Sequence, residues 1–172
     1  YFFTAIYKFA LNHRNQYVIF QNEEDSNVLV RWGVLNSNKI KLIKGSGVKI
    51  EEFTQLNETE GIPTVCFAAR LLKDKGVYEF VLAAELLKKK GIIARFILAG
   101  DIDKKNPSSL SLQELNKLKD NKNIEVLGYH QNIKELYKKS HIVCLPSYRE
   151  GLPKSLIEAA AACRAIVTTD VP

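Results

Sequence analysis

Apolar runs of strand length alternate with stretches of helical periodicity along most of this chain, and this alternation restricts the fold more than any other feature. The runs are almost continuously apolar, which is typical of strands covered on both faces. They comprise residues 65–69, 96–99, 124–127, 142–145 and 165–167. Successive units of strand, helix and strand form right-handed crossovers between parallel strands. The sequence therefore predicts an α/β fold with a doubly wound, Rossmann-like parallel sheet.

The stretches between these runs carry apolar residues at helical spacing and predict four helices. The first ends in three lysines before Gly91, as suits the negative end of a helix dipole. The second is expected to begin near Ser108 and Ser109, since serine favours a helix start. The helices are expected over residues 77–90, 109–118, 133–137 and 156–161.

The first sixty residues follow a looser pattern. A polar stretch from Glu51 to Gly61 separates them from the regular alternation, either as a linker or as a long surface loop. We therefore divide the chain into a leading segment, 1–60, and a domain, 61–172, that is truncated at its C-terminus. The leading segment predicts a helix to about residue 12, a strand at 17–20, a helix at 24–32 and a strand at 40–43.

Composition excludes several classes of protein. The 172 residues are 46% hydrophobic and 26% charged, which indicates a globular domain and excludes a fibre, a disordered tail or a membrane bundle. The opening apolar run is shorter than the roughly 20 residues of a membrane span. The chain has no methionine, opens within an apolar run and stops just after a strand-like stretch. We therefore expect it to be a piece of a longer protein.

Cysteine and histidine predict no site by their spacing. The three cysteines lack close pairing, which argues against a disulfide framework and a zinc site. Cys66, Cys144 and Cys163 are each expected to be small buried hydrophobic residues. The three histidines share no metal-ligand spacing, so no metal is expected.

Ligands of an open parallel sheet bind beyond the carboxyl ends of the strands, so a site is sought in the segments that follow them. Arg70 and Lys75 bracket the entry to the helix after the strand at 65–69. Cations at a helix N-terminus oppose its dipole, and a bound anion such as a diphosphate would explain them. In the alternative, both cations are solvated and Asp74 is their local partner.

Glu150 to Glu158 is the most informative segment. Pro153 suits the first turn of a helix, which leaves Glu150 in the preceding loop and Glu158 inside the helix. The two carboxylates should stand on the order of 10 Å apart. That distance excludes a retaining pair of glycosidase carboxylates but does not clearly exclude an inverting pair. We expect the acids to hold hydroxyls at two ends of one ligand, with an anion at the amides between them; the alternative is an ordinary first-turn acid and an exposed helix residue.

Two glycine-containing turns also follow strands. The turn 45–47 superficially resembles a dinucleotide fingerprint, but Ile50 replaces the third glycine and no clear helix is expected to follow. This turn is either flexible or a point of close backbone approach to a ligand. The turn 128–130 follows the strand at 124–127, and His130 is either an ordinary loop histidine or part of a site.

Several motifs together resemble a known family. The motifs RLLKDKG at 70–76, LAGD at 98–101, PSYREGLP at 146–153 continuing to Glu158, and IVTTDVP at 166–172 are those of the nucleotide-sugar half of family 4 retaining glycosyltransferases with the GT-B fold. The resemblance runs from about Tyr17 to the end. It implies that residues 61–172 form a truncated C-terminal domain that binds the nucleotide-sugar donor.

The resemblance also implies a role for each candidate site residue. Arg70 and Lys75 would neutralise the diphosphate of the donor and the charge of the leaving group, without a metal or another cofactor. Glu150 would contact hydroxyls of the transferred hexose, and Glu158 would bind the ribose. Arg70, Lys75 and Glu150 would be the catalytic residues. Further donor contacts would come from Gly151, Leu152, Pro153, Lys154, Ser155, Ser46, Gly47, Gly128, Tyr129 and His130.

Two residues depart from the family pattern. Lys49 stands where the family usually has aspartate, which would alter a turn near the cleft. Cys163 stands where it usually has glycine, which concerns packing behind the site. In the family, the acceptor domain precedes the donor domain, so this piece is expected to be inactive alone.

The resemblance implies an enzyme that transfers a hexose, with retention, from a nucleotide sugar to a glycan or lipid-linked acceptor in surface polysaccharide biosynthesis. A UDP-sugar is the expected donor. One alternative is a GT-B-like nucleotide-sugar epimerase, and another is a non-catalytic basic binding module, since the net charge is +6. The lysines lack interleaved aromatic residues, so nucleic acid is not an expected partner. A cytoplasmic location is expected, with peripheral contact at the inner face of an anionic membrane as an open alternative.

Overall fold

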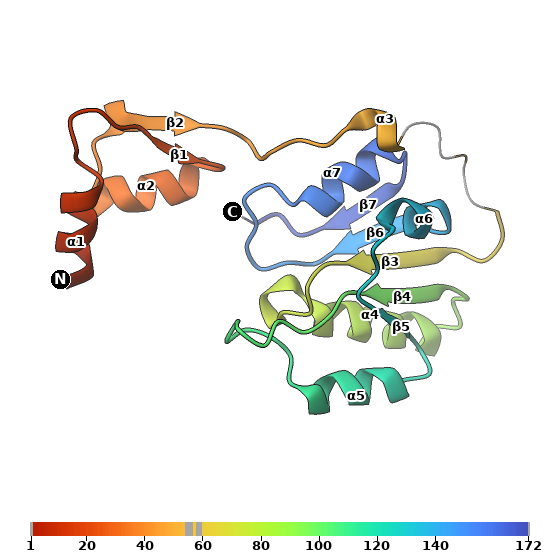
Figure 1. Ribbon diagram of the computed structural model, residues 1–172. Coiled ribbons are helices and arrows are strands. Elements are labelled where there is room, and N and C mark those ends of the chain that lie inside the picture. The colour runs from red at the N-terminus through yellow and green to blue at the C-terminus, as the bar shows by residue number, and fades with distance from the viewer. Residues whose placement is uncertain (1, 54–56, 58–59, 172) are drawn as a thin grey trace. The chain divides into compact units, whose positions relative to one another are not determined.

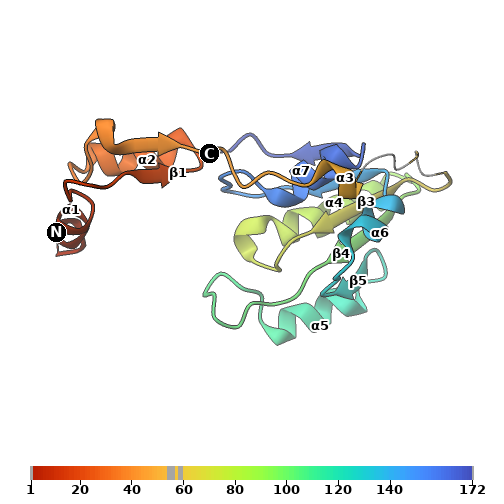
Figure 2. The ribbon, with the colours of Figure 1, turned by 45° about the horizontal axis from the view of Figure 1, so that its top comes forward.

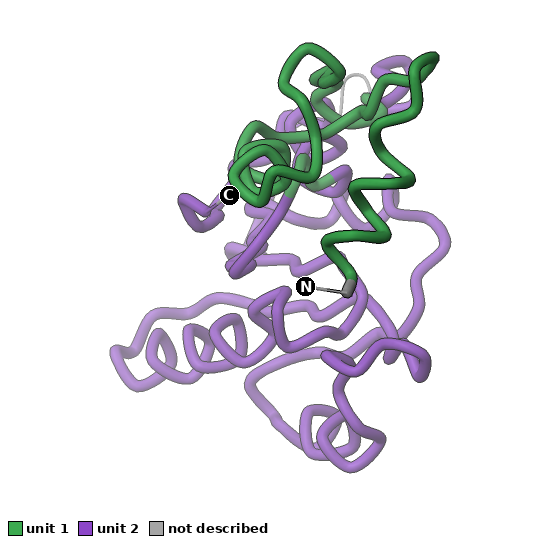
Figure 3. Tube along the Cα trace, turned by 90° about the vertical axis from the view of Figure 1, so that its left-hand side faces the viewer, with its two compact units in different colours: residues 1–47, 151–153, 172 green, residues 48–150, 154–171 purple. Residues whose placement is uncertain are grey.

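The computed structural model describes residues 2–53, 57 and 60–171 (Figure 1). These residues divide into two compact units, which Figure 3 distinguishes by colour. Unit 1 takes the residues up to Gly47 together with Gly151–Pro153, and unit 2 takes Val48–Glu150 and Lys154–Val171. Each unit is described by itself. The predicted division into a leading segment, 1–60, and a donor domain, 61–172, assigns functions to the two parts, and it stays a prediction.

Unit 2 contains a five-stranded parallel sheet, which confirms the predicted fold class. The strand order is β5-β4-β3-β6-β7, so the chain builds outward from a central strand in both directions. Val65 of the central strand lies opposite Phe96 on one side and Ile142 on the other. The strands are β3 (Thr64–Ala68), β4 (Arg95–Ala99), β5 (Glu125–Gly128), β6 (Ile142–Leu145) and β7 (Ala165–Thr168).

Helices cover both faces of this sheet (Figures 1 and 2). Successive side chains of a strand point to opposite faces. Phe67 accordingly packs with α4 (Val77–Lys89) and α5 (Leu112–Asp120) in one buried cluster. Cys66 packs on the other face, in a cluster that contains residues of α3, α6 and α7. These elements are α3 (Ile50–Phe53), α6 (Ile133–Lys138) and α7 (Lys154–Ala161).

The prediction that every strand of the sheet is buried on both faces is wrong for the two edge strands, β5 and β7. All five residues of β3 are buried, whereas the four residues of β7 are all exposed. The reason is position in the sheet, since β3 lies at the centre and β7 at an edge. An apolar run therefore predicts a strand here without predicting how deeply it is buried.

Two helices also differ from the sequence predictions. The helix expected to begin near Ser108 and Ser109 begins at Leu112, because Ser111 forms a capping box with Glu114. Such a box satisfies two free backbone N–H groups at the N-terminus of the helix. The short helix α3 lies where no clear helix was expected after the turn 45–47. Its Phe53 packs against Tyr137 with ring centroids 6.4 Å apart, so tertiary packing stabilises a turn that has little helical pattern of its own.

Unit 1 contains a two-stranded parallel sheet and two helices, close to the elements predicted for this segment. Asn22 caps the second helix by accepting a hydrogen bond from the backbone N–H of Asp25. A short 3₁₀ turn, Ser37–Lys39, precedes the second strand. The elements are α1 (Phe2–Ala10), β1 (Val18–Phe20), α2 (Glu23–Arg31) and β2 (Ile40–Leu42). Among the described residues, no helix is both long and apolar enough to cross a membrane.

The cysteines differ from one another in burial. Cys66 is buried as predicted, Cys144 is half-buried, and Cys163 is exposed. Cys163 is the only non-glycine residue in the described part of the chain with a positive φ, at 55°. It follows α7 in the left-handed conformation that commonly ends a helix. This turn directs the side chain outward, so the prediction of a buried Cys163 is wrong.

Replacing Cys163 with glycine is expected to raise the free energy of unfolding by about 0.5 to 1 kcal/mol. The left-handed conformation costs an L-residue about 1 to 2 kcal/mol, and the greater freedom of glycine in the unfolded chain offsets part of the gain. Chemical denaturation would measure the change. Cys163→Ser keeps the Cβ atom and should show no such gain; an equal rise in both variants would contradict the explanation.

Candidate functional site

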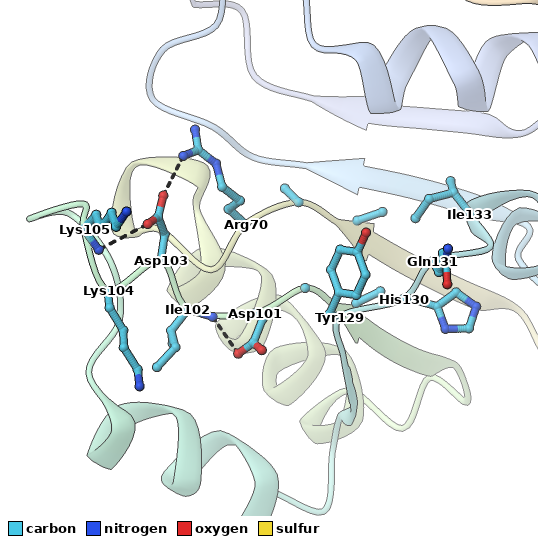
Figure 4. A pocket seen from close by; sticks show the side chains of 14 residues that line it. Arg70, Asp101, Ile102, Asp103, Lys104, Lys105, Tyr129, His130, Gln131 and Ile133 are labelled. Carbon is cyan, nitrogen blue, oxygen red and sulfur yellow. Dashed lines mark hydrogen bonds and ion pairs between the residues drawn. The ribbon is translucent and has the colours of Figure 1, made fainter.

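A cavity of about 600 Å³ lies in unit 2 at the carboxyl ends of β3, β4 and β5 (Figure 4). Small residues at these strand ends, Ala68, Ala99 and Gly100 among them, leave room for a flat group to approach the backbone. Tyr129 and His130 contribute to another wall, and 77% of the Tyr129 surface is exposed. This is the edge of a doubly wound sheet where ligands are expected to bind.

Arg70 lies at the cationic side of this cavity. Its Nη1 donates a hydrogen bond to Oδ2 of Asp103 over 2.8 Å. Lys104 and Lys105 line the same cavity. The partner of Arg70 is thus Asp103 in the loop after β4, and the alternative in which Asp74 is its local partner is wrong.

Lys75 forms an ion pair with Glu150, whose Oε1 lies 2.5 Å from the lysine Nζ. Only 22% of the lysine side chain and 14% of the glutamate side chain are exposed, so the pair is shielded from water. The short 3₁₀ turn Lys73–Lys75 supplies the lysine, and the loop after β6 supplies the glutamate. The structure therefore brings together two residues that the sequence analysis assigned to catalysis.

Hydrogen bonds attach the loop that carries Glu150 to the turn that carries Lys75. The Ser147 hydroxyl and the Tyr148 backbone N–H both donate to the carbonyl oxygen of Asp74, over 3.0 and 2.9 Å. The Tyr148 hydroxyl donates to Glu79 in the first turn of α4. Asp74 thus acts through its backbone. These contacts hold the Lys75–Glu150 pair at the N-terminus of α4.

Glu158 lies on α7 and pairs with Lys154 one turn earlier, with 3.3 Å between the charged atoms. Both residues line a second cavity of unit 2, of about 470 Å³. Gln131 and Ile133 line this cavity as well as the first one, so the two cavities adjoin. Tyr129 lines the first cavity and Glu158 the second, and the two residues therefore lie on neighbouring parts of one surface, with Gln131 and Ile133 between the cavities.

The remaining predicted residues fall into two groups. Ser46, Gly47 and the residues 151–153 belong to unit 1, and the proposed contacts of these residues with the donor stay predictions. Ser155 and Gly128 belong to unit 2. The carbonyl oxygen of Ser155 accepts a hydrogen bond from the buried Tyr137 hydroxyl, which fixes the first turn of α7.

The loop after β4 contributes to the candidate site, although no residue of this loop was predicted to belong to it. Asp103, Lys104 and Lys105 line the first cavity, and none of the three was among the predicted site residues. The available signal was position, because this loop follows the strand at 96–99 and ligands bind beyond strand ends. Gln131 was missed for a similar reason, since it lies just beyond the turn 128–130.

Two buried or half-buried cysteines and one histidine have structural surroundings. Burial raises the pKa of the Cys66 thiol to about 12 and that of Cys144 to about 11, so neither is a thiolate at neutral pH. His141 accepts a hydrogen bond from the backbone N–H of Thr64 and thereby joins β3 to the chain before β6. In the described part of the chain, no three metal-binding side chains gather into a group.

Known protein sequences match this chain over most of its length. The sequence profile of a family described as "Glycosyl transferases group 1" matches residues 48–172. The chain is 35% identical, over 97% of its length, to N,N'-diacetylbacillosaminyl-diphospho-undecaprenol alpha-1,3-N-acetylgalactosaminyltransferase of Campylobacter jejuni. It is 24% identical, over 98% of its length, to the phosphatidylinositol N-acetylglucosaminyltransferase gpi3 subunit of Schizosaccharomyces pombe. The aligned region is 45% and 37% of these two relatives, respectively.

Solved structures show the same fold. A glycosyltransferase from Rickettsia africae superposes with a TM-score of 0.76 at 20% identity, over 97% of this chain and 48% of that one. The Anabaena protein HepE, solved in complex with UDP and glucose, superposes with a TM-score of 0.71 at 18% identity, over 98% of this chain and 49% of that one. The fold is thus that of a GT-B glycosyltransferase. More closely, the chain belongs to the group 1 glycosyl transferases, and it spans less than half of the curated relatives it matches.

Proposed function

We propose that this chain supplies the donor-binding part of an enzyme that transfers a hexose from a UDP-sugar to a lipid-linked or glycan acceptor. The observation that carries the proposal is that Arg70, Lys75 and Glu150 all lie in loops beyond the carboxyl ends of the strands, with Arg70 lining the cavity of about 600 Å³ and Lys75 paired with Glu150. Membership of the family supports the class of reaction.

The cations of the site suit a diphosphate. Arg70 offers a planar group of N–H donors, and Lys75 offers a compact charge at the N-terminus of α4. As the bond to the sugar breaks, negative charge accumulates on the leaving diphosphate. Two fixed cations stabilise that charge more than they stabilise the bound donor, and this difference lowers the barrier.

The acidic residues suit the two ends of the donor. Glu150 is held in place by Lys75, and in the proposed complex its carboxylate accepts hydrogen bonds from hydroxyls of the hexose. Glu158, on the far side of Gln131, accepts hydrogen bonds from the ribose. The nucleobase then occupies the cavity beside Tyr129, where its flat face meets the strand ends. Catalysis in this scheme needs no resident metal, which stays a prediction.

The names of similar proteins guide the choice of substrates. The Campylobacter relative is named for the transfer of N-acetylgalactosamine to a diphospho-undecaprenol acceptor, and HepE was solved with UDP and glucose. We therefore propose a UDP-hexose, including its N-acetylated forms, as donor and a polyprenyl diphosphate glycan as acceptor. Retention of configuration, a role in surface polysaccharide synthesis and action at the cytoplasmic face of a membrane belong to the same proposal.

Calorimetric titration of the intact protein with UDP tests the donor site. Glu158→Ala and Arg70→Ala are each expected to weaken UDP binding about tenfold to 100-fold, since each removes hydrogen bonds to a charged group, worth about 1.5 to 3 kcal/mol. Glu125→Ala removes an equally charged side chain at the amino end of β5 and should leave binding unchanged. Equal affinity of all four proteins would refute the proposed donor site.

A product assay with UDP-sugars distinguishes the proposed transferase from the alternative epimerase. A transferase forms glycosylated product only when an acceptor is present. Epimerised nucleotide sugar formed without any acceptor would contradict the proposal while leaving the donor site intact.

A further inference from the structure

Asp103 is a charged residue of the candidate site to which neither the sequence motifs nor the proposed mechanism assigns a role. It lies in the loop that follows β4 and lines the cavity of about 600 Å³. Figure 4 shows its carboxylate and the Arg70 guanidinium pointing toward each other, joined by the hydrogen bond of 2.8 Å. The two residues are 33 positions apart in the chain, so their contact is a product of the fold.

The Asp103 carboxylate is held in place by its own loop. Its Oδ1 accepts a hydrogen bond from the backbone N–H of Lys105, which leaves Oδ2 for Arg70. The backbone N–H of Asp103 donates to the Ser109 hydroxyl over 2.8 Å, and its carbonyl oxygen accepts from Asn106 over 2.8 Å. The carboxylate is therefore oriented independently of Arg70.

This loop is also joined to the segment that carries Arg70. The backbone N–H of Leu71 donates to the carbonyl of Asp101, and that of Leu110 donates to the carbonyl of Leu71, each over 2.9 Å. A further bond of 2.8 Å runs from Lys73 to the Ser108 carbonyl. Backbone bonds on both sides thus fix the distance between the chain at Arg70 and the loop of Asp103.

The exposure of this ion pair argues that its main effect is not on stability. The Arg70 side chain is 61% exposed and that of Asp103 is 28% exposed, and ion pairs so open to water contribute little to folding. The ion pair can instead affect the orientation of the Arg70 side chain. A long exposed arginine samples many rotamers and loses that conformational freedom when it binds a ligand. Asp103 engages Nη1, which leaves the other N–H groups of the guanidinium for a second anion.

We propose that Asp103 is a positioning residue that holds the Arg70 guanidinium at the mouth of the cavity, ready for the diphosphate of the donor. The inference rests on the proposed donor site and adds a residue to it. Asp103 does not touch the donor. It orients the arginine before binding, so that less rotamer freedom is lost when the phosphate oxygens meet the free N–H groups.

A double-mutant cycle measured by calorimetric titration of the intact protein with UDP tests this role. Asp103→Asn is expected to weaken UDP binding about threefold to tenfold, the range expected for one long side chain that must be ordered on binding. In an Arg70→Ala background, the same change should leave UDP affinity unaltered, since no guanidinium remains to be oriented. Asp103→Glu keeps a carboxylate in reach and should lose less affinity than Asp103→Asn.

Glu125→Gln is the matched control. Glu125 pairs with Arg95 in a similarly exposed arginine–carboxylate contact, but at the amino ends of β4 and β5, so its loss removes the same charge without affecting UDP binding. Unfolding midpoints of all variants are measured alongside; should Asp103→Asn be unstable, Asp103→Glu with and without Arg70→Ala completes the cycle, and a loss that depends on Arg70 is again expected.

The outcomes separate the inference from the proposed function. Failure of the wild-type protein to bind UDP would remove the proposed donor site itself. Weakened binding by Arg70→Ala together with unchanged or tighter binding by Asp103→Asn would leave the donor site standing and overturn the role of Asp103. A loss of equal size in the presence and absence of Arg70 would also overturn it, because the effect would then not pass through the guanidinium.

Discussion

Sugar transfer by the intact enzyme is expected to fall about 100-fold or more when Lys75 is replaced with methionine. Methionine preserves most of the length of the side chain and removes the charge that, in the proposed mechanism, stabilises the departing diphosphate. Loss of one preorganised group of this kind commonly costs about 10²–10³ in kcat. Steady-state kinetics with a UDP-sugar and acceptor would measure the change, which should appear mainly in kcat.

Lys73→Met is the matched control for this prediction. Lys73 belongs to the same 3₁₀ turn but pairs with Glu114, 3.4 Å away, and its side chain is 51% exposed. It should retain activity within about twofold of wild type, since an exposed ion pair contributes at most about 1 kcal/mol to folding. Comparable activity of Lys75→Met and the wild-type enzyme would contradict the catalytic role of Lys75.

Replacing Gly76 with alanine is expected to lower the free energy of unfolding by about 3 to 5 kcal/mol, a large effect for one residue. Gly76 has φ of 75°, and an added Cβ would lie 2.0 Å from the Pro146 carbonyl oxygen and 2.6 Å from its carbon. These are backbone atoms of the chain just beyond β6, so the clash is relieved only by moving that segment or the start of α4. Urea or guanidinium denaturation would measure the loss.

Gly91→Ala separates the two causes of this loss. Gly91 has a similar φ of 72°, but no atom lies within 4 Å of the position of its added Cβ. It should lose only the conformational share, about 1 to 2 kcal/mol. Equal losses at both positions would show that the close approach of Gly76 to Pro146 has no energetic consequence.

The close approach at Gly76 also connects stability with the site. Lys75 directly precedes this glycine, and Pro146 directly precedes the Ser147 whose hydroxyl bonds to Asp74. A side chain at position 76 would therefore push apart the two segments that bring Lys75 to Glu150. We therefore expect Gly76→Ala to lower the stability of the protein and to disturb the geometry of the Lys75–Glu150 ion pair at the same time.

Much of the fold was predictable because its signals are local. The strands β3, β4 and β6 are buried or largely buried, and their apolar runs predicted their bounds to within a residue. The helix α4 was predicted equally well, since its apolar stripe and terminal lysines lie within one continuous segment. The helix α3 was not, because its stability comes from the contact of Phe53 with Tyr137, far along the chain.

Several residues of the candidate site could be predicted from the sequence, whereas their ion-pair partners could not. Motifs near strand ends indicated Arg70, Lys75 and Glu150, and the fold places all three at one edge of the sheet. The alternative to a bound anion made Asp74, their neighbour in sequence, the partner of the two cations. That interpretation is wrong, since Asp74 contributes its carbonyl oxygen and the paired carboxylates, Asp103 and Glu150, lie in the loops after β4 and β6.

By itself, then, the sequence determined the strands, most of the helices and the family, and it indicated Arg70, Lys75 and Glu150 as members of the candidate site, because periodicity and short motifs act over a few residues. Only the tertiary structure decided that Lys75 pairs with Glu150, 75 positions away, and that Arg70 pairs with Asp103. Strand order is the physical reason. With β4 on one side of β3 and β6 on the other, the loops that follow these two strands converge on the loop after β3.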